Sequence, residues 1–228
     1  MSGGLPLIVT RAEPGCAATV GRAAALGFGA WAMPLFAARA LDWNPPDPGD
    51  FYALLLTSAQ APRLVGAGLA PLSGLPVFAV GAATAQAATE AGLRVALTGA
   101  TDGQSILDAM TSQNIGRILW LCGRDRTDFD ARAADLVPLP VYAVDPVDPP
   151  ADWCGLIAAP AVVMAHSARG AARVAALAGP ARKHLTLLAI SLAAARAAGD
   201  GWRETAVPAA FGDAAMLAEA HALCHKGA

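Results

Sequence analysis

Runs of consecutive apolar residues alternate with alanine-rich stretches along almost the whole chain. Such unbroken runs are typical of parallel strands that are buried on both faces of a sheet. The predicted strands lie at 5–9, 30–35, 51–56, 76–80, 94–98, 117–121, 140–144, 161–165, 185–190 and 202–207. The stretches between them are predicted helices, such as the one that begins near Pro14, a residue favoured in a first turn. The pattern predicts an α/β protein with helices on both faces of its sheets.

Two proline-rich segments interrupt this alternation, DWNPPDPGD at 42–50 and VDPVDPPAD at 144–152. Proline restricts itself and the preceding residue to extended backbone, so both segments are predicted to be extended linkers. They bracket five of the predicted strands, and the other five lie outside them. We therefore predict two Rossmann/flavodoxin-like domains joined by a two-stranded extended linker. The outer, discontinuous domain is 1–41 plus 150–228, and the inserted domain with its flanking linker segments is 42–149.

The two predicted domains contain similar pairs of turns. In the inserted domain ALLLTSAQA is followed by FAVGAATAQA, and in the outer domain VVMAHSARGA is followed by LAISLAAARA. Ser58 precedes Gly81 by 23 positions, and Ser167 precedes Ser191 by 24. Each pair is a strand–serine–helix turn followed by a second strand–turn–helix unit. The repetition predicts an internal duplication.

These turns fall where ligands bind in open parallel sheets, beyond the carboxyl ends of the strands. A helix that starts there offers unpaired N–H groups and a partial positive charge, which suit an anion. Ordinary N-capping is the alternative for each hydroxyl. Because both domains carry such turns, we expect them to line a cleft for an acidic ligand. The turn residues are Thr57, Ser58, Gly81, Ser167 and Ser191.

Three further groups are candidates for the same site. Thr10 and Arg11 end the first predicted strand, and the alternative for Arg11 is a surface position. Arg124 follows the strand RILWL, where a solvated charged loop is the alternative. Tyr142 is one of two tyrosines in the chain, and it can equally be an amphipathic core residue.

Composition and charge exclude several classes of protein. The chain is 55% hydrophobic and 15% charged, which is typical of a core-rich globular protein. A net charge of −2 provides no basic field for nucleic acid. The uncharged run 23–38 is too short and too broken for a membrane span. The four cysteines form no C-x-x-C pair and are predicted to be buried free thiols in a reducing cytoplasm.

Familiar catalytic and cofactor motifs are missing from the sequence. It has no G-x-G-x-x-G after a strand, no G-x-x-x-x-G-K-[ST], no G-x-S-x-G and no H-E-x-x-H. His166 ends a strand without an obvious aspartate partner. His221, Cys224 and His225 share a helix face, but a solvated, frayed helix end is favoured over a metal site. We expect no cofactor and no metal.

The order and spacing of seven segments resemble the uroporphyrinogen-III synthase family over essentially the whole chain. The segments are LIVTRAEP, LLLTSAQA, FAVGAATAQAATEAGL, DGQSIL, RILWLCGRDR, LPVYAV and MAHSARGA. The resemblance implies a cofactor-free cyclase of tetrapyrrole biosynthesis with two α/β domains. Its substrate would be hydroxymethylbilane, a linear tetrapyrrole rich in carboxylates, bound between the domains largely through backbone N–H groups.

The resemblance also implies a mechanism that consists mainly of orienting a reactive substrate. The substrate loses its hydroxyl as water, and ring D is inverted through a spiro intermediate before the macrocycle closes. Tyr142 matches the tyrosine of the family's VY pair and is the candidate proton donor for the departing hydroxyl. The predicted substrate-binding set is Thr10, Arg11, Thr57, Ser58, Gly81, Thr84, Arg124, Ser167 and Ser191. We expect a cytoplasmic monomer with possible transient contact to the preceding enzyme of the pathway.

Some positions depart from the family pattern. Its Gly-Pro-Thr-Thr turn appears here as Ser191-Leu192-Ala193-Ala194, and Ala168 stands where the family often has proline. These losses leave open a weakly active or divergent paralogue. The sequence is also compatible with a non-catalytic two-lobed binding protein for an acidic small molecule, and with a module that docks another tetrapyrrole enzyme.

Overall fold

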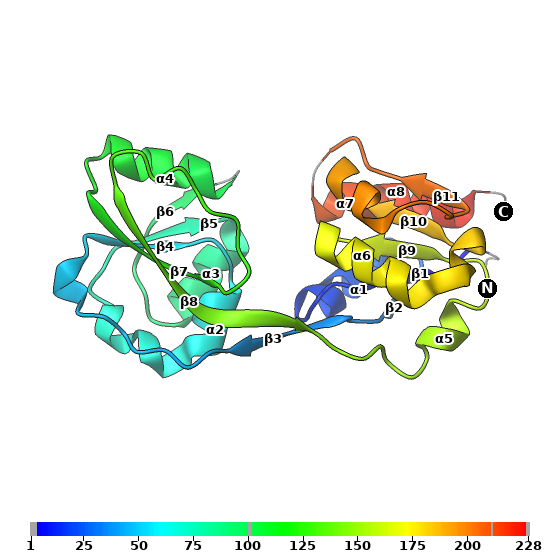
Figure 1. The fold of residues 1–228 in the computed structure, drawn as a ribbon, viewed down its shortest axis with the longest axis horizontal. Helices are drawn as coiled ribbons and strands as arrows, with labels where there is room; N and C mark the ends of the chain where they lie inside the picture. The colour runs from blue at the N-terminus through cyan, green and yellow to red at the C-terminus, as the bar shows by residue number, and fades with distance from the viewer. Residues whose placement is uncertain (1–3, 100–101, 211, 227–228) are drawn as a thin grey trace. The chain divides into compact units, whose positions relative to one another are not determined.

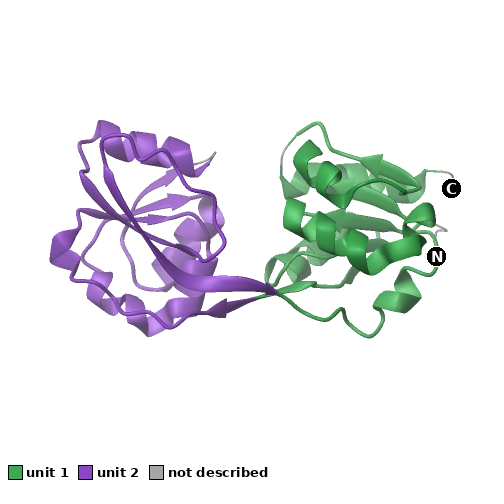
Figure 2. Ribbon diagram, viewed as in Figure 1, with its two compact units in different colours: residues 1–37, 146–228 green, residues 38–145 purple. Residues whose placement is uncertain are grey.

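The computed structural model describes residues 4–99, 102–210 and 212–226. The chain divides into two compact units (Figure 2), which are described separately below. Unit 1 comprises residues 1–37 and 146–228, and unit 2 comprises residues 38–145.

Unit 1 is built on a five-stranded sheet in which every neighbouring pair is parallel (Figure 1). The strands, in the spatial order β11-β10-β9-β1-β2, are β11 (Glu204–Ala206), β10 (Thr186–Ala189), β9 (Val162–Ala165), β1 (Leu7–Val9) and β2 (Ala30–Ala32). Residues of α1 (Gly15–Ala25) and α8 (Asp213–His225) share one core cluster of this unit. Residues of α6 (Ala168–Ala178) and α7 (Leu192–Ala198) share another. The short helices α5 (Trp153–Leu156) and η3 (Gly179–His184) complete the unit.

Unit 2 contains a six-stranded sheet in the order β3-β8-β7-β4-β5-β6. The strands are β3 (Phe36–Ala40), β8 (Asp135–Pro146), β7 (Arg117–Gly123), β4 (Ala53–Leu56), β5 (Val77–Val80) and β6 (Val95–Gly99). One core cluster joins the sheet to α2 (Gln60–Val65), η2 (Gly66–Leu72) and α3 (Ala82–Glu90). A second cluster joins it to α4 (Gly103–Ser112), and η1 (Pro48–Asp50) precedes β4.

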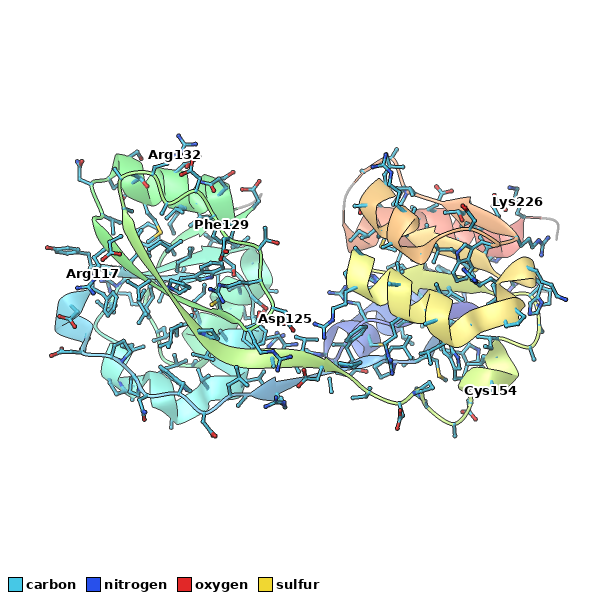
Figure 3. The ribbon with its side chains drawn as sticks, in the orientation of Figure 1. Arg117, Asp125, Phe129, Arg132, Cys154 and Lys226 are labelled. Carbon is cyan, nitrogen blue, oxygen red and sulfur yellow. The ribbon has the colours of Figure 1, made fainter. Side chains whose placement is uncertain are left out.

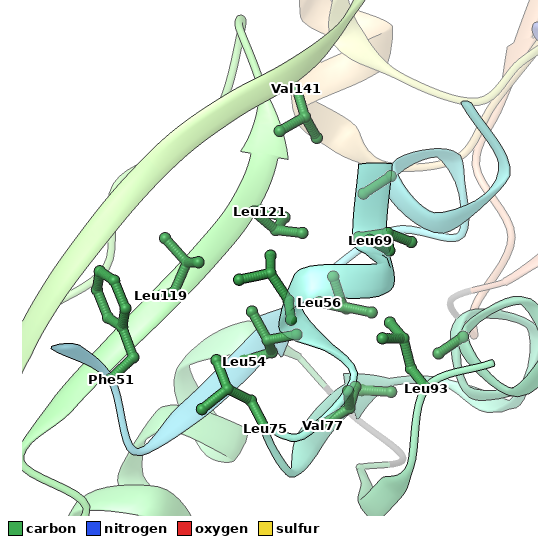
Figure 4. Packing of buried hydrophobic residues seen from close by; sticks show 14 of the residues in the cluster. Phe51, Leu54, Leu56, Leu69, Leu75, Val77, Leu93, Leu119, Leu121 and Val141 are labelled. Atoms are coloured by element: carbon green, nitrogen blue, oxygen red, sulfur yellow. The ribbon is translucent and has the colours of Figure 1, made fainter. Parts of the chain in front are cut away.

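The run Ala53-Leu54-Leu55-Leu56 shows why the central strands are apolar without interruption. Successive side chains of a strand point to opposite faces of the sheet. Leu54 and Leu56 pack with Leu119 and Leu121 of β7 in one cluster (Figure 4). Leu55 packs in the cluster on the other face, beneath α4. The predicted parallel sheets with helices on both faces are therefore confirmed.

The strands of the two sheets follow the same spatial order if those of unit 1 are counted from β9 instead of β1. In unit 2, the strands β4 to β8 occupy the order β6-β5-β4-β7-β8. Starting unit 1 at β9 and ending it at β2 gives the matching order β11-β10-β9-β1-β2. This circular permutation makes β9 equivalent to β4, and β1 equivalent to β7. The topology agrees with the predicted duplication, because the repeated serine turns follow equivalent strands.

The connection between the units contains a strand that the hydrophobic pattern did not predict. β3 has the sequence FAARA, in which Phe36 is the only large apolar residue, and its neighbour in the sheet is β8. Next to the strand, the Leu41 N–H donates to the Val141 carbonyl (3.0 Å), and the Val147 N–H donates to the Leu35 carbonyl (3.1 Å). Residue numbers rise along one strand as they fall along the other, so β3 and β8 pair in the antiparallel sense. This strand forms because it pairs with β8. The hydrophobic pattern of the sequence does not reveal such pairing.

β8 is longer than predicted, because it begins before the apolar run PVYAV. Its first half includes Pro138 and Pro140, which pair in register with Trp120 and Cys122 of β7. Proline cannot donate to a ladder and is tolerated where its nitrogen faces an open edge. The two prolines are two residues apart, so both nitrogens face the same side.

Two further expectations were wrong. The segment 42–50 is not simply an extended linker, since η1 lies within it and Trp43 packs against the core of unit 2. Asp47 caps η1 by accepting a hydrogen bond from the Gly49 N–H at 2.8 Å. Cys154, predicted to be buried, is exposed on α5 (Figure 3).

The central position of β4 leads to a stability prediction. Leu55→Ala should lower the free energy of unfolding by about 2–5 kcal/mol, because the side chain is fully buried and leaves a cavity. Urea unfolding followed by circular dichroism measures the change. Leu97→Ala in the same unit is the control, since Leu97 is 37% exposed and its truncation should change the free energy by less than about 0.5 kcal/mol. Equal losses in the two variants would contradict the packing described for β4.

Candidate functional site

Each unit has a topological switch point. This is a pair of neighbouring strands from which the chain continues toward opposite edges of the sheet. In unit 2 the switch lies between β4 and β7, and in unit 1 it lies between β9 and β1. Ligands of open α/β sheets bind outside the carboxyl ends of the strands at such points. Six of the ten predicted site residues follow these four strands, namely Thr10, Arg11, Thr57, Ser58, Arg124 and Ser167. Gly81 and Thr84 follow the neighbouring strand β5, Ser191 follows β10, and Tyr142 lies within β8.

The phenol of Tyr142 on β8 lies at the edge of unit 2, where the residue is 9% exposed. Its ring lies against Gly123, where an added Cβ would be 3.0 Å from Cζ and 3.1 Å from the hydroxyl oxygen. Gly123 ends β7 and pairs with Tyr142 across a register shift. The Arg124 N–H then donates to the Tyr142 carbonyl at 2.8 Å. The absence of a side chain at Gly123 therefore provides the space that the ring occupies.

The environment of Tyr142 keeps its phenol protonated at neutral pH. Burial raises the pKa of the phenol above its ordinary value, and a hydrogen bond with the Ser58 side chain opposes part of that rise. Ser58 follows β4, and its hydroxyl oxygen also accepts from the Gln60 N–H at 3.2 Å. The sequence predicted Ser58 and Tyr142 as separate candidates, and the fold brings their side chains together. A neutral phenol at a strand-end edge can donate a proton or a hydrogen bond.

Arg124 lies at the same edge, and its guanidinium is engaged by carboxylates. Its Nη2 is 2.5 Å from Asp145 and 3.3 Å from the neighbouring Asp125. Arg39 on β3 donates to the other oxygen of Asp145 at 2.7 Å. Hydrogen bonds from Arg124 and then Arg39 lower the pKa of the Asp145 carboxyl. Asp145 thus links the carboxyl end of β7 to the connecting strand β3.

The hydroxyl of Thr57 has an aromatic partner. Trp120 of β7 donates its indole N–H to Thr57 Oγ1 at 3.1 Å. Phe129, in the loop after β7 (Figure 3), packs on Trp120 with ring centroids 4.6 Å apart. Arg126 lies over the same indole at 5.6 Å. This stack was not predicted, and it holds the first turn residue after β4 in place.

Gly81 and Thr84 begin α3. Gly81 precedes the helix with φ of +80°, a conformation that glycine adopts without strain. Its N–H donates to the Gly99 carbonyl at 2.8 Å. Thr84 is 5% exposed, so its side chain offers little surface to a ligand.

At the edge of unit 1, the predicted hydroxyl groups have structural partners. Thr10 donates to the Met164 carbonyl at 2.7 Å and so links β1 to β9 across the switch point. Ser167 caps α6 by accepting from the Gly170 N–H at 2.9 Å, and Ser191 caps α7 by accepting from the Ala194 N–H at 3.2 Å. The capping alternative therefore describes both serine side chains.

The strongest charged cluster of unit 1 was missed by sequence reasoning. Asp213, the first residue of α8, accepts from Thr19 (2.8 Å), His166 (3.0 Å), Arg11 (3.2 Å) and Arg22 (2.6 Å). Burial favours the protonated acid, but hydrogen bonds from His166, Thr19 and Arg22 outweigh it and hold the Asp213 pKa well below its usual range.

His166 therefore has the aspartate partner that the sequence did not reveal. Burial lowers the pKa of the imidazole despite its hydrogen bond to Asp213, so the ring is neutral at pH 7. The only available sequence signal for Asp213 was an acidic residue at the start of the last helix, which by itself is an ordinary first-turn preference.

On the His221–Cys224–His225 face, Cys224 is buried, whereas His221 is exposed, as expected for a solvated helix end. The two imidazoles stack at 4.4 Å, and Phe28 meets His221 edge-on at 5.3 Å. Burial raises the pKa of the Cys224 thiol to about 11, and a protonated thiol is a poor metal ligand. Among the described residues, no group of three potential metal ligands is found, and no helix is long and apolar enough to cross a membrane.

Together the two switch points define a class: a two-unit, doubly wound α/β protein with polar groups at the strand ends of each unit. A solved uroporphyrinogen-III synthetase from Helicobacter pylori has this fold, with a TM-score of 0.65 and 14% identity over 96% of this chain and 99% of that chain. A mutant uroporphyrinogen III synthase from the extremely thermophilic bacterium Thermus thermophilus gives a TM-score of 0.52 and 17% identity over 97% of this chain and 99% of that chain. No curated protein matches the sequence.

The model of the family described as uroporphyrinogen-III synthase HemD matches residues 17–218. The chain belongs to the uroporphyrinogen-III synthase family, whose members are enzymes of porphyrin biosynthesis. The match includes Tyr142 and both switch points apart from the end of β1, which precedes residue 17.

The Ser58–Tyr142 hydrogen bond can be tested by titration. In a Tyr52→Phe background Tyr142 is the only tyrosine, so tyrosinate absorbance reports its ionisation alone. Ser58→Ala should raise the pKa of Tyr142 further, because the Ser58 hydrogen bond lowers it. Ser73→Ala is the control, since Ser73 bonds only to the nearby Ala70 carbonyl among its described contacts. An identical titration curve in the two variants would contradict the contact.

Proposed function

We propose that this protein is a uroporphyrinogen-III synthase that cyclises hydroxymethylbilane with loss of water and inversion of ring D. Family membership supports the reaction. We assign the reaction to the edge of unit 2 because of the phenol of Tyr142. This phenol is buried, protonated and held between Gly123 and Ser58.

The reaction requires a group that assists the departure of a hydroxyl as water. A phenol with a raised pKa keeps its proton at neutral pH and can transfer it to, or share it with, the leaving oxygen. Loss of the hydroxyl leaves an electrophilic carbon, which the substituted carbon of ring D attacks to give the spiro intermediate. Opening and reclosure invert ring D and release a proton from the ring carbon that forms the final bond. The overall change is the loss of one water.

The remaining task of the protein is to hold the flexible bilane in one conformation. The substrate carries many carboxylates, and the strand ends of both units offer groups that suit anions. In unit 2 these are the turns at Thr57, Ser58 and Gly81, with Thr84 and Arg124 nearby. In unit 1 they are Thr10, Arg11, Ser167 and Ser191. Because several hydroxyl groups cap helices or link strands, we assign substrate binding at those turns mainly to backbone N–H groups and to the arginines.

The activity needs no cofactor in this scheme, since the substrate supplies both the leaving group and the nucleophile. We further propose that the protein acts in the cytoplasm as a monomer and has at most transient contact with the enzyme that makes the bilane. Rapid transfer would limit spontaneous closure to the uninverted isomer.

The product isomer tests the proposed function. Purified protein is supplied with hydroxymethylbilane generated in situ from porphobilinogen, and the oxidised products are separated by chromatography. We expect mainly the type III isomer, against a no-enzyme control that gives type I. Type I alone from folded protein would overturn the assignment. Binding of the bilane without type III formation would indicate a non-catalytic binding protein.

Tyr142→Phe tests the role of the phenol. Removing the hydroxyl should lower kcat for type III formation by roughly 100-fold, the lower end of general acid catalysis, because the reactive substrate retains a slower route. KM should change little. The control is Tyr52→Phe, whose side chain is 69% exposed and which should retain full activity. An unchanged kcat in Tyr142→Phe would exclude this tyrosine as the proton donor.

A further inference from the structure

Arg11 occupies a position that its neighbours define closely. It follows β1 at the switch point of unit 1, and its guanidinium lies over Gly15 in the first turn of α1. A Cβ built on Gly15 would be 2.5 Å from Nε and 2.8 Å from Cζ of Arg11. No side chain fits at position 15 while Arg11 keeps this conformation. Gly15 therefore forms a cradle for the guanidinium.

A carboxylate fixes the same group from a second direction. Nη1 of Arg11 lies 3.2 Å from Oδ1 of Asp213. Thr19 and His166 donate to that same oxygen, and Arg22 binds the other oxygen through both Nε (2.9 Å) and Nη2 (2.6 Å). The carboxylate is thus held by α1 and by the end of β9, and its position sets that of Arg11.

The arginine nevertheless remains accessible to a ligand. Its side chain is 36% exposed, and guanidinium carries five N–H donors, of which the contact with Asp213 uses one nitrogen. An anion that reaches the strand end would meet a planar donor whose orientation is already set. Prior ordering lowers the conformational entropy lost on binding and strengthens the interaction.

The equivalent strand of unit 2 has the same arrangement. β7 corresponds to β1 under the circular permutation, and Arg124 follows it as Arg11 follows β1. Asp145 binds Arg124 as Asp213 binds Arg11. A strand-end arginine with a carboxylate partner thus occurs at both switch points, although the partners come from unrelated parts of the chain.

We propose that Gly15 and Asp213 are positioning residues that orient Arg11 to bind a carboxylate of the substrate. This inference rests on the proposed function, and it assigns roles to two residues that sequence reasoning did not select. A purely structural role for Asp213, joining α8 to α1, would need Arg22 and Thr19 but would not need the cradle at Gly15.

Gly15→Ala separates the two roles. The substitution displaces the guanidinium while leaving Asp213 and its other partners unchanged, and alanine favours the helix over glycine. We expect KM for hydroxymethylbilane to rise about tenfold with kcat for type III formation unchanged, the signature of lost uniform binding. The melting temperature should stay the same or increase. The matched control is Gly21→Ala in the same helix, because a Cβ there has no neighbour within 4 Å.

Further substitutions at Arg11 and Asp213 complete the test. Arg11→Gln should raise KM at least as much as Gly15→Ala, and the double variant should show no additional rise, because both changes remove the same interaction. Asp213→Asn should also raise KM, because it removes the negative charge that Arg11 pairs with.

The outcomes distinguish the positioning role from the proposed function. If the wild type makes type III product and Gly15→Ala has the KM of Gly21→Ala, the positioning role is wrong and the function stands. Additive effects of Gly15→Ala and Arg11→Gln would also overturn the positioning role. If the wild type gives only type I, both proposals fail.

Discussion

The parallel pairing of β4 with β7, and of β9 with β1, is the constraint on which the candidate site depends. These central pairs are buried, so the strands are apolar on both faces and carry no chemistry of their own. Polar groups appear only where the strands end. Because parallel strands end at one edge, residues distant in sequence, such as Ser58 and Tyr142, come together there.

The charged side chains at these edges are paired. Arginines at the ends of β1 and β7 are each paired with an aspartate, and neither aspartate belongs to the helix that follows the same strand. Such pairs are partly exposed, so they contribute little to stability by themselves. Their main effect is to fix the orientation of a flexible cation, which is useful to an enzyme that must hold a flexible polyanion in one conformation.

The hydroxyl groups at the strand ends mainly support the fold, and the backbone N–H groups remain for binding. Thr10, Thr57, Ser167 and Ser191 all make hydrogen bonds within the protein, either between strands or at helix starts. Ser191 is followed by Leu192, which is 65% exposed, and by Ala194, which is fully buried in the core. At position 194 a methyl group is thus packed in the core, and Ser191 provides the cap that starts α7.

The sequence alone determined the positions of ten strands, the doubly wound class and the repeated serine turns. Burial of the central strands on both faces of a parallel sheet leaves unbroken apolar runs, and the start of a helix after a strand favours a capping residue. It also indicated Tyr142 through resemblance. Only the tertiary structure decided which residues contact one another between distant elements. β3 exists because β8 pairs with it, and Tyr142 fits because Gly123 has no side chain. Asp213 joins Arg11, Arg22, Thr19 and His166 because α8 packs beside α1 and the end of β9. Periodicity records burial within one element, whereas hydrogen bonds and ion pairs between distant elements depend on how those elements pack.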